Sequence, residues 1–177
     1  MSLPVKTILR FILFILFQVF VLDRILLFHL VTPYVYFLFL LWLPFRIPRP
    51  LLMLAGFLLG FTLDSFQHNP GFYAAACVLI AYLRPFFINI MIPQQGAENN
   101  FEAPSFRSMG GIGPYMLFAG ILCLIHNFWL FLFQVFTFGN FWYLLFKTIL
   151  STAVSIVLIF ILELMFVRKQ KFRTNAR

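Results

Sequence analysis

The sequence predicts an all-α fold, a polytopic helical bundle that crosses a membrane six times. Of the 177 residues, 63% are hydrophobic, and the mean hydropathy is +0.98. Only 10% are charged, whereas a soluble globular domain has about 25%. A chain of this length cannot hide so much apolar surface in a core of its own, because small domains leave much of their surface exposed. The composition therefore predicts a single integral membrane domain.

Six apolar segments reach, or nearly reach, the roughly 20 residues that a spanning helix needs. They cover residues 7–22, 30–43, 51–66, 72–92, 114–136 and 141–167. The second segment is the shortest. As a helix it would reach only about 21 Å, so we expect it to thin the bilayer locally or to lie covered by its neighbours.

The basic residues orient the bundle, because cytoplasmic loops carry the excess of Lys and Arg. With the N-terminus in the cytoplasm, eleven of the 13 Lys and Arg face inward. They are Lys6, Arg10, Arg46, Arg49, Arg84, Arg107, Arg168, Lys169, Lys171, Arg173 and Arg177. Both basic termini then lie in the cytoplasm, which requires an even number of crossings. This distribution explains the net charge of +8 without a nucleic-acid partner.

Two polar segments complete the expected organisation. Residues 93–113 are predicted to form a flexible cytoplasmic loop, and residues 168–177 a basic cytoplasmic tail. The tail fixes the topology, and its charge also suits the anionic lipid of the membrane surface.

A narrow stripe of small and polar residues marks the third segment. Gly56, Gly60, Asp64 and His68 recur every four residues, so they share one helix face. Glycines at this spacing let another helix approach closely in a membrane, and intramembrane acids are often functional. We therefore predict a packing or interaction seam here, which ends at the turn containing Gly71.

Depth along the helices suggests partners for the buried charges. Asp64 lies about 22 Å along its helix from the cytoplasmic end, near the outer boundary, where Lys147 or Arg24 is the expected cation. Arg84 lies deeper towards the cytoplasm, at the level of Glu163. A cap or a polar neighbour at the helix end is the alternative partner for Asp64.

Catalytic chemistry and cofactors are not predicted. Asp64, Ser65 and His68 resemble a triad in composition, but Ser65 points about 100° away from the other two, out of reach of a base. The three histidines are isolated, and Cys77 and Cys123 lie inside apolar runs without metal-ligand spacing. No metal site is expected. Asn127 and Gln134 are expected to form hydrogen bonds between helices.

The stretch "LLMLAGFLLGFTLDSFQHNPGFYAAACVLIAYLRPFF" resembles the core signature of the bacterial rod shape-determining family MreD. The matching residues are Gly56, Phe57, Gly60, Asp64, Gly71, Ala74, Ala75, Ala76, Ala81, Tyr82 and Arg84. The stretch "TPYVYFLFLLWLP" is similar to the family's second segment. The Arg84-Pro85 pair and the abundance of Phe resemble a Bacteroidetes-type member.

The resemblance implies a non-enzymatic scaffold of the cell-elongation complex in the bacterial inner membrane. It implies binding to the transmembrane helix of MreC and work with RodA and a class B penicillin-binding protein in lateral peptidoglycan synthesis. The resemblance does not say which face binds MreC. It also does not say whether the chain forms a homodimer or holds a lipid.

The fold of this family is similar to the substrate-binding subunits of energy-coupling factor transporters, and such a subunit is the alternative function. Those subunits often dock through small residues spaced four apart on the first span. Residues 7–22 contain no Ala or Gly, which favours the MreD interpretation.

Overall fold

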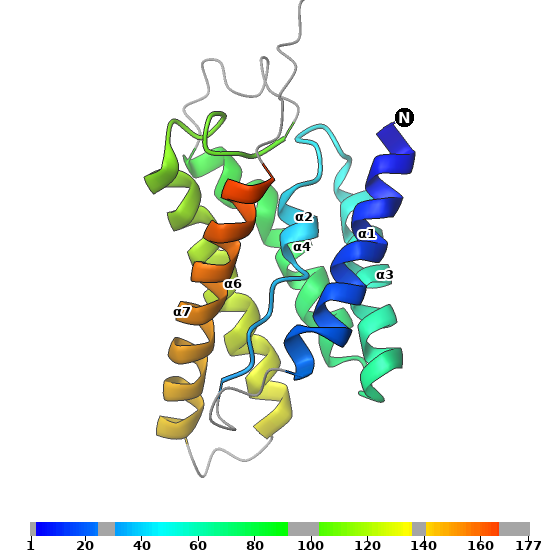
Figure 1. Cartoon of the computed structure of the whole chain (residues 1–177), viewed down its shortest axis with the longest axis vertical. Coiled ribbons are helices and arrows are strands. Elements are labelled where there is room, and N and C mark those ends of the chain that lie inside the picture. The colour runs from blue at the N-terminus through cyan, green and yellow to red at the C-terminus, as the bar shows by residue number, and fades with distance from the viewer. Residues whose placement is uncertain (1–2, 25–30, 92–102, 136–140, 167–177) are drawn as a thin grey trace, which may run out of the picture.

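The computed structural model describes residues 3–24, 31–91, 103–135 and 141–166, and the elements in this part of the chain are all helices (Figure 1). Two of its helices are short, the 3₁₀ helix η1 and α2. In chain order the helices are α1 (Leu3–Phe20), η1 (Leu22–Arg24), α2 (Leu38–Leu41), α3 (Arg49–Gln67), α4 (Phe72–Met91), α6 (Ile112–Val135) and α7 (Phe141–Met165).

Helices α3, α4, α6 and α7 are long and apolar enough to cross a membrane. Their ends lie within two residues of the predicted segments 51–66, 72–92, 114–136 and 141–167. The chain therefore has the helices of a multi-pass membrane protein. Helix α1 has 18 residues, which corresponds to about 27 Å.

The prediction of a spanning helix over residues 30–43 is wrong. Residues 31–37 are not helical, and only the single turn of α2 follows them. Figure 1 shows this segment passing through the middle of the bundle, with α1 and α3 on one side and α6 and α7 on the other. Residues 31–35 are extended, whereas residues 36 and 37 already form a turn, in which Phe37 has helical φ and ψ. Extended chain rises about 3.3 Å per residue, so these five residues cover about 17 Å, about twice the length of a five-residue helix. The short segment thereby reaches across the bundle, which a helix of the same residues could not do.

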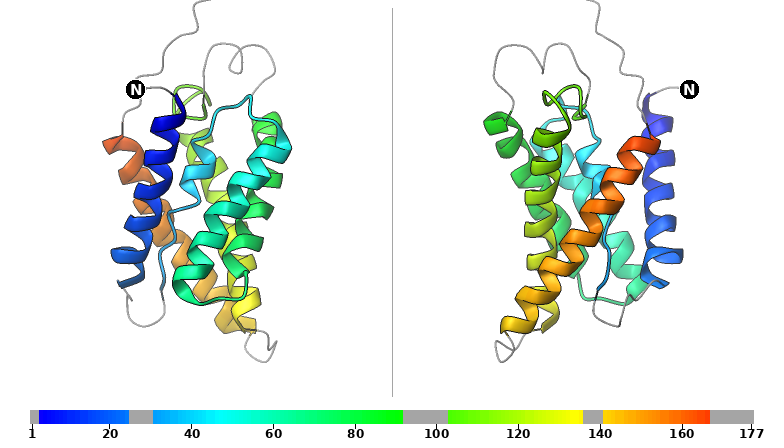
Figure 2. Two further views of the ribbon diagram at one scale, coloured as in Figure 1. Left: turned by 90° about the vertical axis from the view of Figure 1, so that its right-hand side faces the viewer. Right: turned by 60° about the vertical axis from the view of Figure 1, so that its left-hand side comes forward.

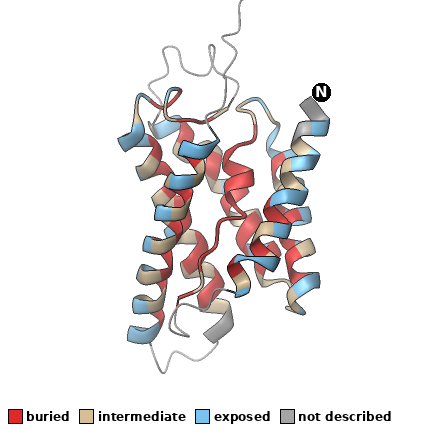
Figure 3. Cartoon of the chain, viewed as in Figure 1, coloured by how far each residue is buried: buried red, intermediate tan, exposed pale blue. Residues whose placement is uncertain are grey.

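Burial explains why this extended segment is tolerated. Residues 33–43 are all buried, and they form the continuous red chain in the centre of Figure 3. Backbone without helical hydrogen bonds is stable at membrane depth only where protein covers it. Here the surrounding helices provide that cover.

Helices α3 and α4 pack with their backbones in contact, and Figure 2 shows them side by side. A Cβ atom on Gly60 would lie 2.4 Å from the Cα atom of Ala74, and one on Gly56 would lie 2.9 Å from the carbonyl oxygen of Cys77. Neither position has room for a side chain. The glycines of the predicted seam therefore face α4 of the same chain.

The α3–α4 turn depends on two residues with positive φ. His68 ends α3 in the left-handed conformation, with φ of 55°, and Gly71 has φ of 102°. Gly suits such a position because it has no Cβ.

Residues 103–111 fold against the bundle, although they belong to the loop predicted to be flexible. Ser105 and Ser108 hydrogen-bond each other through backbone and side chain. Met109 is buried, and the ring of Phe106 lies 5.0 Å from that of Tyr115. Residues 93–102 of the predicted loop lie outside the described residues.

Candidate functional site

The candidate site is the buried polar network around the extended segment, because intramembrane polar residues are costly unless they have a role. Gln18 of α1 is fully buried. Its Oε1 accepts a hydrogen bond from the backbone N–H of Val35 at 3.1 Å, and its Nε2 donates to the carbonyl of Pro33 at 3.1 Å. The amide of Gln18 thus supplies the acceptor and the donor that a neighbouring strand would offer to this backbone.

Helix α7 holds the same segment from the opposite side with small hydroxyl residues. Ser155 Oγ accepts from the backbone N–H of Tyr34 at 3.0 Å, and Ser151 Oγ accepts from that of Thr32 at 3.3 Å. Both serines are fully buried. Backbone groups that would cost several kcal/mol if unpaired in a membrane are therefore satisfied by side chains.

The turn at the end of α2 is held by two charged residues. Arg84 of α4 donates through Nη2 to the carbonyls of Leu41 and Leu43. Glu163 of α7 accepts from the indole Nε1 of Trp42 at 2.7 Å and from the hydroxyl of Tyr115 at 3.1 Å. We expected Arg84 to lie beside Glu163 as its charge partner. Instead, each of the two residues is hydrogen-bonded to the same turn.

A second polar group lies on α6. The hydroxyl of Tyr36 and Nε2 of His126 are 2.8 Å apart, and Asn127 donates to Thr152 Oγ1 of α7 at 3.0 Å. The predicted interhelical hydrogen bond of Asn127 is confirmed. The side chain of Gln134 lies outside the described residues.

Asp64 caps the N-terminus of α4. Its Oδ1 accepts from the backbone N–H of Tyr73 at 3.1 Å and its Oδ2 from that of Ala74 at 2.8 Å. An anion suits the positive end of a helix dipole. Of the two expected cations, Lys147 has its Nζ 4.5 Å from the centre of the Phe131 ring, and Arg24 is exposed. The alternative expectation, a cap at the helix end, is confirmed.

Asp23 joins the ends of α1 and α3. It accepts hydrogen bonds from Gln18 Nε2 at 2.8 Å and from Gln67 Nε2, and Gln67 accepts from the hydroxyl of Tyr73 at 2.6 Å. Burial raises the pKa of Asp23 above its ordinary value of 3.8, and the two amide hydrogen bonds partly oppose this rise.

Two polar residues near the end of α3 that were singled out from the sequence lie outside the network. His68 is exposed, and Ser65 donates to the Phe61 carbonyl of its own helix at 2.9 Å. Arg46 and Arg49 are exposed, whereas Arg10 is half-buried. The side chain of Lys6 and the basic residues Arg168, Lys169, Lys171 and Arg173 lie outside the described residues.

Gln18, Ser151 and Ser155 were not predicted from the sequence. A signal exists for the serines, because the buried face of α7 carries polar side chains at helical spacing. That face contains Leu144, Thr148, Ser151, Thr152, Ser155, Ile159 and Glu163. Gln18 is a lone amide in an apolar run, and only its burial identifies it.

Among the described residues, no group of three or more His, Cys, Asp and Glu side chains could hold a metal ion. Comparison with protein-family models, curated proteins and solved structures gives no match to this chain.

Proposed function

We propose that this chain is an MreD-like membrane scaffold that binds the transmembrane helix of MreC. In this proposal it crosses the inner membrane six times, with both termini in the cytoplasm. It works without catalysis beside RodA and a class B penicillin-binding protein, and it helps to organise lateral peptidoglycan synthesis. Its fold would then be similar to that of the substrate-binding subunits of energy-coupling factor transporters.

One observation carries the proposal: the polar side chains inside the bundle bind the chain's own backbone. Asp64, Arg84, Gln18 and the two serines of α7 each bond backbone N–H or C=O groups. A carrier instead directs polar groups at a ligand near the membrane midplane. Polar groups used in this way make a rigid body with an apolar exterior, which suits a scaffold.

The exterior has apolar residues for a partner helix on several sides. Ile12 of α1, Phe61 of α3 and Ile149 of α7 are 47%, 55% and 59% exposed. Association of helices in lipid depends on packing of such surfaces.

The test is affinity purification of the tagged chain from native membranes, with a photo-crosslinking residue at position 12, 61 or 149. We expect MreC and RodA to be recovered, with a crosslink to MreC from one of the three positions. Recovery of a pair of transporter ATPases without MreC would instead establish the alternative function.

A further inference from the structure

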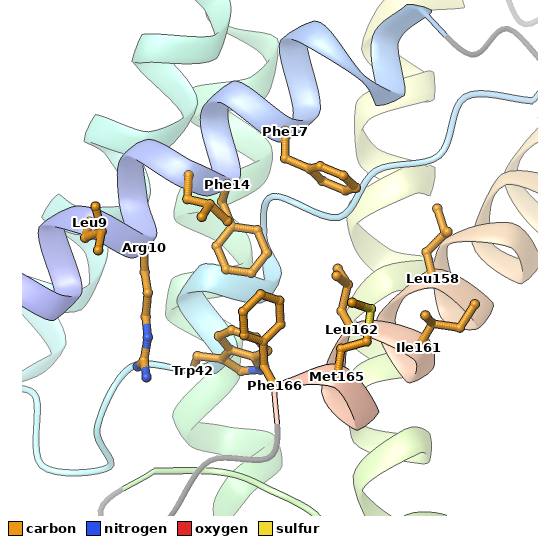
Figure 4. A pocket seen from close by; sticks show the side chains of 11 residues that line it. Leu9, Arg10, Phe14, Phe17, Trp42, Leu158, Ile161, Leu162, Met165 and Phe166 are labelled. Carbon is orange, nitrogen blue, oxygen red and sulfur yellow. The ribbon is translucent and has the colours of Figure 1, made fainter.

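An apolar groove lies between α1 and α7 on the outside of the bundle (Figure 4). Its volume is about 630 Å³, within the range of roughly 300–1,000 Å³ that small-molecule sites occupy. The wall on α1 consists of Leu9, Arg10, Leu13, Phe14 and Phe17. Trp42 forms the inner surface between the two helices.

The opposite wall is entirely apolar. It consists of Leu158, Ile161, Leu162 and Met165, whose spacing places them on one face of α7, and of Phe166, the residue after the helix. Met165 is 73% exposed, and methionine adapts its shape to an apolar ligand.

The length of the groove distinguishes between an acyl chain and a transmembrane helix. From Arg10 to Phe17 the α1 wall rises about 11 Å, and from Leu158 to Phe166 the α7 wall rises about 12 Å. The hydrocarbon core of a bilayer is about 30 Å thick, so one leaflet is about 15 Å. The groove therefore matches one leaflet, whereas a spanning helix needs a surface about twice as long.

The polar end of the groove matches a lipid phosphate. Among the described residues that line the groove, Arg10 is the charged one, and its guanidinium carbon lies 5.8 Å from the centre of the Trp42 ring. Arginine binds phosphate oxygens through two parallel N–H groups.

We propose that this groove binds an anionic phospholipid from the leaflet on the side where α1 begins. One acyl chain lies between α1 and α7 against Trp42, and the phosphate binds Arg10. Residues of this chain form the groove, so the proposal does not depend on the identity of the protein partner.

The buried indole of Trp42 provides the first test. Trp42 is only 4% exposed, so lipid around the bundle contacts it little. The chain with Trp129→Phe and Trp142→Phe keeps Trp42 as its only tryptophan. We expect brominated phosphatidylglycerol to quench its fluorescence at a concentration at least tenfold lower than brominated phosphatidylcholine. Arg10→Gln should remove this preference, and the control Arg46→Gln, which changes an exposed arginine, should keep it.

Native mass spectrometry of the delipidated full chain provides the second test, with phosphatidylglycerol as the probe. Leu13→Trp fills the groove and should reduce bound lipid at least tenfold. Leu117→Trp changes a 57% exposed residue of α6 and should leave binding unchanged. Equal binding by these two variants would overturn the proposal, as would equal quenching by the two lipids or a crosslink from position 13 to a partner helix. Thermal unfolding of each variant shows that a loss of lipid is not a loss of fold.

Discussion

Arg84 and Glu163, on different helices, hold the same three-residue turn. Arg84 donates to the carbonyls of Leu41 and Leu43, and Glu163 accepts from the indole of Trp42 between them. Both charged side chains are buried, at 2% and 5% exposure. The two residues thereby fix the point at which α2 ends and the chain leaves the bundle.

Replacing Arg84 by Met should lower the free energy of unfolding by about 2 kcal/mol, because two buried carbonyls lose a charged donor. Unfolding by SDS in mixed micelles measures this change. Glu163→Gln keeps an acceptor for Trp42 and should cost about 1 kcal/mol. The control Arg107→Gln alters an exposed residue and should change little. Equal stability of the Arg84→Met and Arg107→Gln proteins would show that the turn does not depend on Arg84.

Gly60→Ala should destabilise the protein by about 3 kcal/mol or more, because overpacking a tight contact has this cost. The new methyl group would lie 2.4 Å from Ala74 Cα, an atom of the α4 backbone that cannot move aside alone. Gly113→Ala is the matched control, since no other atom lies within 4 Å of its Cβ position. SDS unfolding compares the two. A Gly60→Ala protein as stable as the control would contradict the close packing of α3 and α4.

Asp64→Ala should cost about 1 kcal/mol, the usual effect of losing a helix cap. Exchanging the charges by Asp64→Lys together with Lys147→Asp should rescue none of the loss, because Asp64 bonds the backbone of Tyr73 and Ala74. Thermal unfolding of the single and double variants measures the coupling. Recovery of stability in the double variant would instead establish an ion pair with Lys147.

Asp23 makes stability depend on pH in the acid range. Its folded pKa lies above the ordinary value of 3.8 because burial disfavours the carboxylate. A raised folded pKa means that the stabilising contribution is present below 3.8 and is lost as the pH rises through the folded pKa. Asp23→Asn should flatten this part of the curve of unfolding temperature against pH. An unchanged curve would show that Asp23 is not the titrating group.

The four long helices were predictable because each is a continuous apolar run ended by turn residues. Proline and glycine mark such ends, as at Asn69-Pro70-Gly71. The glycine seam was also predictable from spacing, although spacing alone does not say whether a seam faces the same chain or a partner. Here it faces α4.

The extended crossing was not predictable from its own residues, because Leu, Phe and Val in residues 30–43 suit a buried helix and a buried strand equally. Its conformation depends on Gln18, Ser151 and Ser155, which are distant in sequence. The same holds for Arg84, since its partners are backbone carbonyls that carry no sequence signal. Charge pairing predicted the wrong partner for Arg84, and for Asp64 the alternative of a helix cap was right.

The crossing of residues 31–43 through the bundle interior is tested most directly by labelling exposed positions on either side of it. Arg24 and Arg46 are both exposed, and the native Cys77 and Cys123 are buried. Arg24→Cys and Arg46→Cys are treated with a membrane-impermeant maleimide in spheroplasts and in inverted membrane vesicles. We predict that Arg24→Cys is labelled only in spheroplasts and Arg46→Cys only in inverted vesicles. Labelling of both positions from the same side would contradict the crossing, and with it the six-crossing scaffold.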